Sequence, residues 1–137
     1  MIGGGKNISP SEIENKIKCS PYIKEAIVIG DGRRFLSALI MIDYENVGKW
    51  AQKNRLAYTN YKSLAGNREV FDLIRKEVDT ANRSFARVES IKKFTILEKE
   101  LDQDDEELTA TQKVKRKVIE KKFKNEIDAI YGVRQEA

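Results

Sequence analysis

The feature that most constrains the fold is a pair of short apolar runs separated by a turn with two glycines. The runs are Ala26–Ile29 and Phe35–Ile42, and the turn at 30–34 reads Gly-Asp-Gly-Arg-Arg. Glycine accepts the positive φ angles that hairpin turns require, so this segment predicts a β-hairpin. The second run is apolar at almost every position, which predicts a central strand covered on both faces.

Helices are expected on either side of this hairpin. Ser9 is a candidate N-cap, with Pro10 in the first turn and Glu12 at the capping-box position, and Ser20-Pro21 ends that helix. Apolar periodicity predicts the other elements. They are helices at Tyr44–Leu56, Asn67–Phe85 and 113–131, a polar connection at 59–63, and a strand at Ile91–Leu97. The order predicts one α+β domain over 1–137: a small antiparallel sheet built on the hairpin, flanked by about four helices.

Composition excludes several classes of function. The 137 residues contain no histidine, which removes Ser-His-Asp and Cys-His nucleophile systems and most zinc sites. The single cysteine, Cys19, cannot form an internal disulfide, so a cytoplasmic location is expected, with Cys19 as a small buried apolar residue. No apolar run approaches the roughly 20 residues that span a bilayer, and the N-terminus has no signal-peptide pattern.

Charge is distributed unevenly, although the net charge is only +4. An acidic stretch at 98–107 is followed by a basic stretch at 113–124. A solvated loop and a solvated helix face are the simplest interpretation. A nucleic-acid patch or a site for a phosphate-bearing substrate are the alternatives, and the acidic neighbour argues against a long polyanion.

One lysine in the basic stretch stands out by its position. Thr111 is a candidate N-cap of the last helix, which places Lys113 in the first helical turn. The helix dipole disfavours a cation there by up to about 1 kcal/mol, which suggests that Lys113 faces an anion. The glycines at 3–5 followed by Lys6 could cradle a phosphate, although the P-loop spacing is absent and an ordinary flexible start is the alternative.

Two segments resemble a known enzyme family. The segment 4–15 (Gly-Gly-Lys-Asn-Ile-Ser-Pro-Ser-Glu-Ile-Glu-Asn) resembles the loop and helix that open the small C-terminal domain of adenylate-forming (AMP-binding) synthetases. The segment 108–116 (Leu-Thr-Ala-Thr-Gln-Lys-Val-Lys-Arg) resembles the closing motif Leu-Thr-Pro-Thr-x-Lys-x-Lys-Arg of the bacterial long-chain fatty acyl-CoA synthetases. Segments 31–40 and 85–94 also read like that branch, so the likeness runs from about Gly4 to Tyr131.

The resemblance implies a reaction and a partner domain. Such enzymes use ATP with Mg²⁺ to convert a fatty acid to an acyl-adenylate and then transfer the acyl group to coenzyme A. A large N-terminal domain carries most of the ATP and acyl sites, and the small domain swings between two poses as a mobile lid. The chain is therefore expected to be a C-terminal domain that is inactive alone and works with a large N-terminal domain that it lacks.

The resemblance also implies roles for residues. Lys113 is the counterpart of the closing-motif lysine that reaches into the adenylation site, and Thr109, Thr111 and Arg116 belong to the same motif. Gly4, Gly5 and Lys6 are the counterparts of the loop that lines the coenzyme A channel, and no metal ligand is expected in this chain. Ala110 stands where proline is usual, and Gln112 stands where many shorter-chain relatives have glycine.

Two other functions remain open at this level. The basic last helix could make the chain a stand-alone nucleic-acid-binding module, although no nucleic-acid partner is expected from the resemblance. The same helix could attach the protein peripherally to an anionic membrane. Its apolar stripe of Ile119, Phe123, Ile127 and Ile130 is expected to face the core, which argues against insertion into lipid.

Overall fold

The structure is a computed structural model that describes residues 9–30 and 32–132. The chain divides into two compact units, Met1–Lys99 and Glu100–Ala137. The division falls inside the acidic stretch at 98–107, where no glycine or proline marks a boundary in the sequence.

The first unit contains a three-stranded sheet with the order β1-β2-β3. Strands β1 (Ile23–Ile29) and β2 (Leu36–Ile42) pair antiparallel, with Ala26 opposite Ile40, so the predicted hairpin is confirmed. β2 is the central strand, and its residues from Ser37 to Ile42 are all buried, as predicted. The sheet is mixed, because β3 (Ile91–Ile96) runs parallel to β2, whereas the sequence predicted an antiparallel sheet. A long helical crossover separates β2 from β3, and such connections return a chain in the parallel direction.

The helices of the first unit begin at side-chain caps. Ser9 Oγ accepts a hydrogen bond from the Glu12 N–H at 3.2 Å, which confirms the predicted start of the first helix. The helices are α1 (Pro10–Ile17), α2 (Tyr44–Lys53), α3 (Tyr61–Ala65) and α4 (Arg68–Asn82), followed by a 3₁₀ turn at Arg87–Glu89. The polar connection predicted at 59–63 is wrong, because Asn60 and Ser63 form a capping box that starts α3. A helix of five residues is too short to show apolar periodicity.

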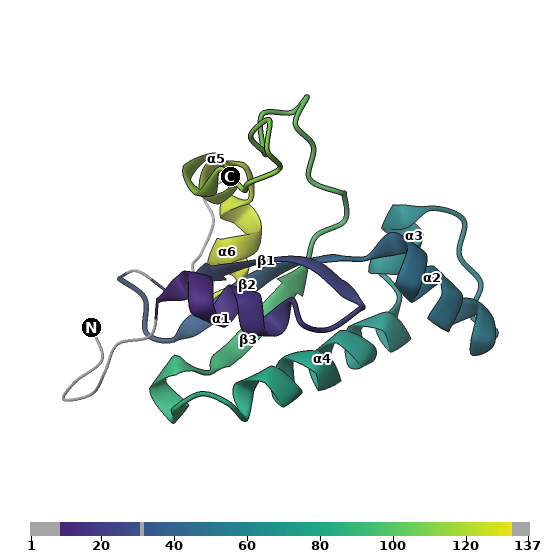
Figure 1. Cartoon of the computed structure of the whole chain (residues 1–137), viewed down its shortest axis with the longest axis horizontal. Coiled ribbons are helices and arrows are strands. Elements are labelled where there is room, and N and C mark those ends of the chain that lie inside the picture. The colour runs from purple at the N-terminus through teal and green to yellow at the C-terminus, as the bar shows by residue number, and fades with distance from the viewer. Residues whose placement is uncertain (1–8, 31, 133–137) are drawn as a thin grey trace. The chain divides into compact units, whose positions relative to one another are not determined.

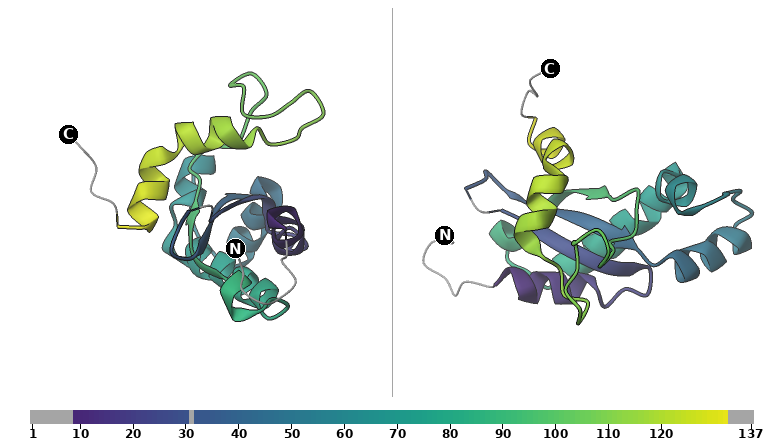
Figure 2. Two further views of the ribbon diagram at one scale, coloured as in Figure 1. Left: turned by 90° about the vertical axis from the view of Figure 1, so that its left-hand side faces the viewer. Right: turned by 90° about the horizontal axis from the view of Figure 1, so that it is seen from above.

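The core of this unit lies between one face of the sheet and the helices. Alternate residues of each strand point to the same face, so Ala26, Ile40 and Ile96 share one side. Helices α1 and α4 lie side by side against the strands, as Figure 1 and the two views of Figure 2 show. The helical members of the core are Ile13, Ile17, Val47, Ala51, Leu64, Ala65, Val70, Ile74, Val78 and Ala81.

Cys19 differs from its prediction. It lies just beyond the end of α1 and is exposed, so it is not a small buried core residue. The buried stripe of α1 consists of Ile13 and Ile17. Cys19 follows Ile17 by two residues, which places its side chain on a different side of the chain from that stripe.

Over residues 100–132, the second unit contains two short helices. The helix predicted over 113–131 is wrong at its start and is interrupted, because α5 (Arg116–Lys122) and α6 (Lys124–Ile130) meet at Phe123. Phe123 has φ −107° and ψ 27°, outside the helical range. The predicted inner residues Ile119, Phe123, Ile127 and Ile130 are nevertheless all buried. Their burial leaves none of this stripe exposed for insertion into lipid.

Candidate functional site

Lys113 lies on a short hairpin of the second unit, ahead of helix α5. Leu108 and Val114 form an antiparallel bridge. On either side of it, the Thr109 N–H donates to the Lys113 carbonyl at 2.8 Å, and the Lys115 N–H donates to the Glu107 carbonyl at 2.9 Å. The closing segment is therefore two paired extended strands joined by a tight turn, which we call the 107–115 hairpin.

The tip of the 107–115 hairpin is a hydrogen-bonded turn. The Gln112 N–H donates to the Thr109 carbonyl at 2.9 Å, and Gln112 has a φ of 65°. A turn followed by a left-handed residue is a common way to close a short hairpin. Glycine meets that conformation most easily, so a glycine would also suit this position.

The hairpin corrects the prediction that Lys113 lies in the first helical turn. Lys115 is the N-cap residue of α5, and Thr111 does not cap a helix. Strand pairing holds Lys113 in an extended segment before the helix begins, so the unfavourable dipole interaction does not arise. The hypothesis that Lys113 faces an anion therefore loses its dipole argument and depends on the exposure of the side chain.

The threonine hydroxyls of the closing motif form hydrogen bonds within the hairpin. Thr109 Oγ1 accepts a hydrogen bond from the Lys113 N–H at 3.0 Å. Thr109 Oγ1 and Thr111 Oγ1 lie 3.1 Å apart, within hydrogen-bond distance. Together with the bond from the Thr109 N–H, these contacts fix the backbone of Lys113 on both sides. Arg116, the fourth residue of the motif, is half-buried at the first position of α5.

The ammonium group of Lys113 is available to an external ligand. The side chain is exposed. Over residues 9–30 and 32–132 it has no hydrogen-bond or ion-pair partner. A solvated ammonium on this hydrogen-bonded hairpin can meet an anion outside this unit.

The acidic and basic stretches are joined within the second unit. Glu107 Oε2 lies 3.4 Å from Lys122 Nζ, and Lys124 Nζ lies 2.6 Å from Asp128 Oδ2. Two of the basic side chains of 113–124 are therefore already paired with carboxylates. This pairing lowers the positive charge that α5 and α6 offer to a nucleic-acid backbone.

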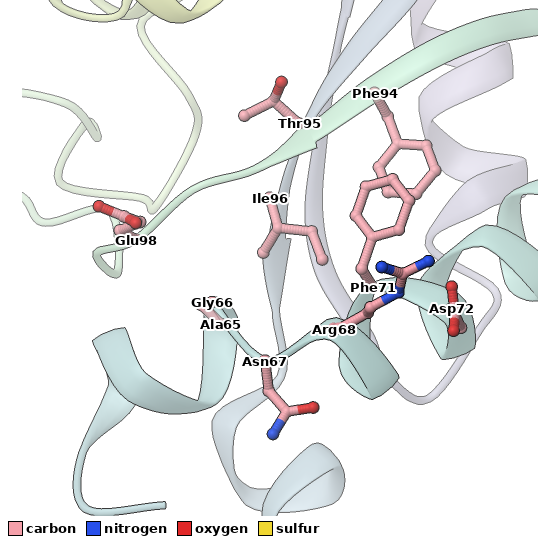
Figure 3. Close-up of a pocket in the computed structure, with 10 residues that line it drawn as sticks. All are labelled: Ala65, Gly66, Asn67, Arg68, Phe71, Asp72, Phe94, Thr95, Ile96 and Glu98. Carbon is pink, nitrogen blue, oxygen red and sulfur yellow. The ribbon is translucent and has the colours of Figure 1, made fainter.

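An open hollow of about 470 Å³ lies in the first unit beside the start of α4 (Figure 3). The rings of Phe71 and Phe94 stack in it with centroids 4.7 Å apart. Its charged lining combines one cation, Arg68, with two carboxylates, Asp72 and Glu98, so it does not favour an anionic ligand. The other lining residues are Ala65, Gly66, Asn67, Thr95 and Ile96. Sequence reasoning did not indicate this hollow, because Phe71 belongs to the apolar stripe of its helix.

Comparison with known protein families places nearly the whole chain in one of them. The model of the family described as "AMP-binding enzyme C-terminal domain" matches residues 1–135. The chain belongs to this family. The match confirms the resemblance found in segments 4–15 and 108–116.

The curated relatives of this AMP-binding C-terminal domain are fatty-acid–CoA ligases by name. The long-chain-fatty-acid–CoA ligase FadD15 of Mycobacterium tuberculosis is 41% identical over 133 residues, which cover 96% of this chain and 22% of that protein. The putative fatty-acid–CoA ligase fadD11 of the same species is 37% identical over 129 residues, covering 93% of this chain and 22% of that protein. The chain thus spans about a fifth of the length of these relatives, at their C-terminal part.

Solved structures show the same fold at low identity. The adenylation domain of the carboxylic acid reductase from Segniliparus rugosus, in complex with AMP and a co-purified carboxylic acid, matches 96% of this chain with a TM-score of 0.69 and 16% identity. A fatty acyl-CoA synthetase of Mycobacterium tuberculosis matches 92% with a TM-score of 0.53 and 20% identity. The matches cover 19% and 20% of those chains.

Some predicted site features of this AMP-binding C-terminal domain have no structural description. Gly4, Gly5 and Lys6 lie outside the described residues, so their place in a coenzyme A channel stays a prediction. Among residues 9–30 and 32–132, no group of three or more Cys, Asp or Glu side chains is arranged to hold a metal ion. Within the same ranges, every helix is too short or too polar to cross a membrane.

The turn of the 107–115 hairpin yields a first prediction. Ala110 is the second residue of the turn, a position where proline is favoured, and within the described part of the chain its N–H has no acceptor. Ala110→Pro should therefore stabilise the turn by about 0.5–1 kcal/mol, by restricting the unfolded chain. Hydrogen exchange at the Lys113 amide should slow about two- to fivefold. Faster exchange in the proline variant would show that the turn has a different geometry.

Proposed function

We propose that this chain is the C-terminal domain of a long-chain-fatty-acid–CoA ligase and acts with a large N-terminal domain on ATP, a fatty acid and coenzyme A. The family match and the printed functions of the 41% and 37% identical relatives support the proposal. The coverage of about a fifth of those relatives supports the expectation that this chain supplies one part of the site and a larger domain supplies the rest.

The single observation that carries the mechanism is the exposed ammonium of Lys113 on the 107–115 hairpin. In the first half-reaction, a carboxylate oxygen of the fatty acid attacks the α-phosphorus of ATP. The bond from that phosphorus to the bridging oxygen breaks, and pyrophosphate leaves. Both reactants are anionic, so an ammonium that donates to both lowers their repulsion and stabilises the crowded phosphorus.

In the second half-reaction, the thiol of coenzyme A attacks the acyl carbon of the adenylate, a thioester forms, and AMP leaves. We assign Gly4, Gly5 and Lys6 to the channel for the pantetheine arm on the strength of the resemblance of segment 4–15 alone. Glycines suit such a channel, because the backbone can approach a ligand closely where no Cβ intervenes.

ATP and its Mg²⁺ are assigned mainly to the large domain. That assignment rests on the resemblance stated for segments 4–15 and 108–116. We also propose a cytoplasmic location, on the ground that the single cysteine has no partner in the chain for a disulfide. A peripheral membrane contact would have to use charged side chains of α5 and α6, because their apolar stripe is buried.

A domain exchange tests the proposed function. In the mycobacterial ligase FadD15, the matching C-terminal 22% would be replaced by this chain. We expect the hybrid to form fatty acyl-CoA and AMP from ATP, palmitate and coenzyme A. The truncated ligase without any C-terminal domain is the negative control. A hybrid that folds and binds ATP but does not exceed the truncated ligase in either half-reaction would contradict the proposal.

A further inference from the structure

Glu107 is unusual among the acids of the 98–107 stretch. Its side chain is 1% exposed, whereas the other acids of that stretch are exposed. A carboxylate is rarely buried to this degree unless its charge is paired and its oxygens accept hydrogen bonds. Its burial therefore points to a structural task at the base of the 107–115 hairpin.

The backbone of Glu107 is bonded on both sides. Its N–H donates to the Asp102 carbonyl at 3.1 Å, and its carbonyl accepts from the Lys115 N–H at 2.9 Å. The first bond ties the hairpin to the 102–106 loop. The second bond closes the base of the hairpin opposite Lys115, which occupies the N-cap position of helix α5.

The carboxylate of Glu107 contacts the 102–106 loop and helix α5. Oε1 accepts a hydrogen bond from the Asp102 N–H at 2.9 Å, and Oε2 lies 3.4 Å from Lys122 Nζ. Lys122 Nζ also donates to the Asp105 carbonyl at 2.6 Å. One buried side chain thus joins three segments: the loop, the hairpin and the last turn of α5.

We propose that Glu107 is a positioning residue for Lys113, and that its ion pair with Lys122 holds the 107–115 hairpin in a fixed orientation on α5. The hairpin has a single bridge, Leu108 to Val114, which by itself would leave its tip free to move. A misplacement of about 1 Å can cost about 100-fold in rate, so the ammonium needs a rigid base. The reaction that this positioning serves rests on the proposed function, but the positioning does not.

Hydrogen exchange on this chain tests the positioning directly. In Glu107→Gln the charge pair is lost, and we expect exchange at the Lys113 and Lys115 amides to accelerate about tenfold or more, given the size of hydrogen bonds to charged groups. Lys122→Met removes the same ion pair and also the bond to the Asp105 carbonyl, so it should accelerate exchange at least as much. The double variant should show less than the sum of the two single effects, because the two side chains share one ion pair. The amide of Ile40 in β2 reports on the first unit and should not change.

Two matched variants complete the experiment. Glu106→Gln removes the same charge one residue earlier from an exposed side chain and should leave exchange unchanged. Lys122→Arg keeps a cation of similar reach and should retain most of the protection. Unchanged exchange at Lys113 and Lys115 in both Glu107→Gln and Lys122→Met overturns the proposal. The proposal is also overturned if exchange at the Ile40 amide accelerates as much as exchange at Lys113 and Lys115 in both variants. Glu107 would then stabilise the whole chain and not the hairpin in particular.

The half-reactions separate this inference from the proposed function. In the hybrid ligase, Glu107→Gln should lower adenylate formation about tenfold and leave thioester formation from added acyl-adenylate unchanged, which a general loss of folding would not do. If the hairpin loosens while Lys113→Ala has no effect on adenylation, the proposed role of Lys113 fails and the positioning by Glu107 stands. If Lys113→Ala is inactive while Glu107→Gln leaves adenylation and exchange intact, the positioning fails and the function stands.

Discussion

Lys113→Ala should lower the rate of acyl-adenylate formation by about 100-fold or more in a ligase that carries this chain as its C-terminal domain. The alanine removes the ammonium that we propose meets the carboxylate and the α-phosphate in the transition state. Two hydrogen bonds of Lys113 remain: its N–H still donates to Thr109 Oγ1, and its carbonyl still accepts from the Thr109 N–H. Both use backbone atoms of residue 113, which alanine keeps. The hairpin should therefore keep its shape.

The second half-reaction, thioester formation, can be assayed separately from the first. When acyl-adenylate and coenzyme A are supplied directly, Lys113→Ala should transfer the acyl group at a rate close to that of the unmodified ligase. Lys117→Ala is the matched control, because Lys117 belongs to the same basic stretch and is exposed on α5. Equal losses in both half-reactions, or none in either, would contradict the role assigned to Lys113.

Ile40→Ala should destabilise the first unit by about 3 kcal/mol. Ile40 is fully buried in the central strand and faces the core formed with α1 and α4. Truncation leaves a cavity in addition to the lost burial of apolar surface. Denaturant unfolding can be followed by the fluorescence of Trp50, the single tryptophan, which packs against the same core.

A surface variant calibrates this measurement. Val88 is 60% exposed, and Val88→Ala should change the free energy of unfolding by about 0.5 kcal/mol at most. If Ile40→Ala were as mild as Val88→Ala, the face of β2 that carries Ile40 could not be the centre of the core.

Local signals predicted much of the fold. The glycine turn at 30–34 lies between the strands it joins, so the hairpin and its central strand could be inferred without distant contacts. The parallel pairing of β3 could not be inferred in this way, because it depends on a crossover of nearly fifty residues between Ile42 and Ile91. Helix α3 has too few residues to show a period.

The candidate site was predictable in part. The closing-motif resemblance named Lys113 and the threonines, but it implied no geometry for them. The 107–115 hairpin escaped prediction because its left-handed residue is Gln112, which carries none of the signal that glycine would give. Glu107 escaped because a buried acid within a run of exposed acids looks like its neighbours in sequence. Its role became visible only through Lys122, fifteen residues further along the chain.

Chemical reactivity of the lysine amines in the hybrid ligase tests the central claim most directly. The enzyme would be treated briefly with an amine-acylating reagent, with and without ATP, Mg²⁺ and a fatty alcohol that binds in place of the acid but cannot react. Mass spectrometry would then compare Lys113 with Lys117. The account predicts that ATP with the alcohol lowers the reactivity of Lys113 at least tenfold while that of Lys117 stays the same. Equal reactivity of Lys113 in the free and loaded enzyme would contradict it.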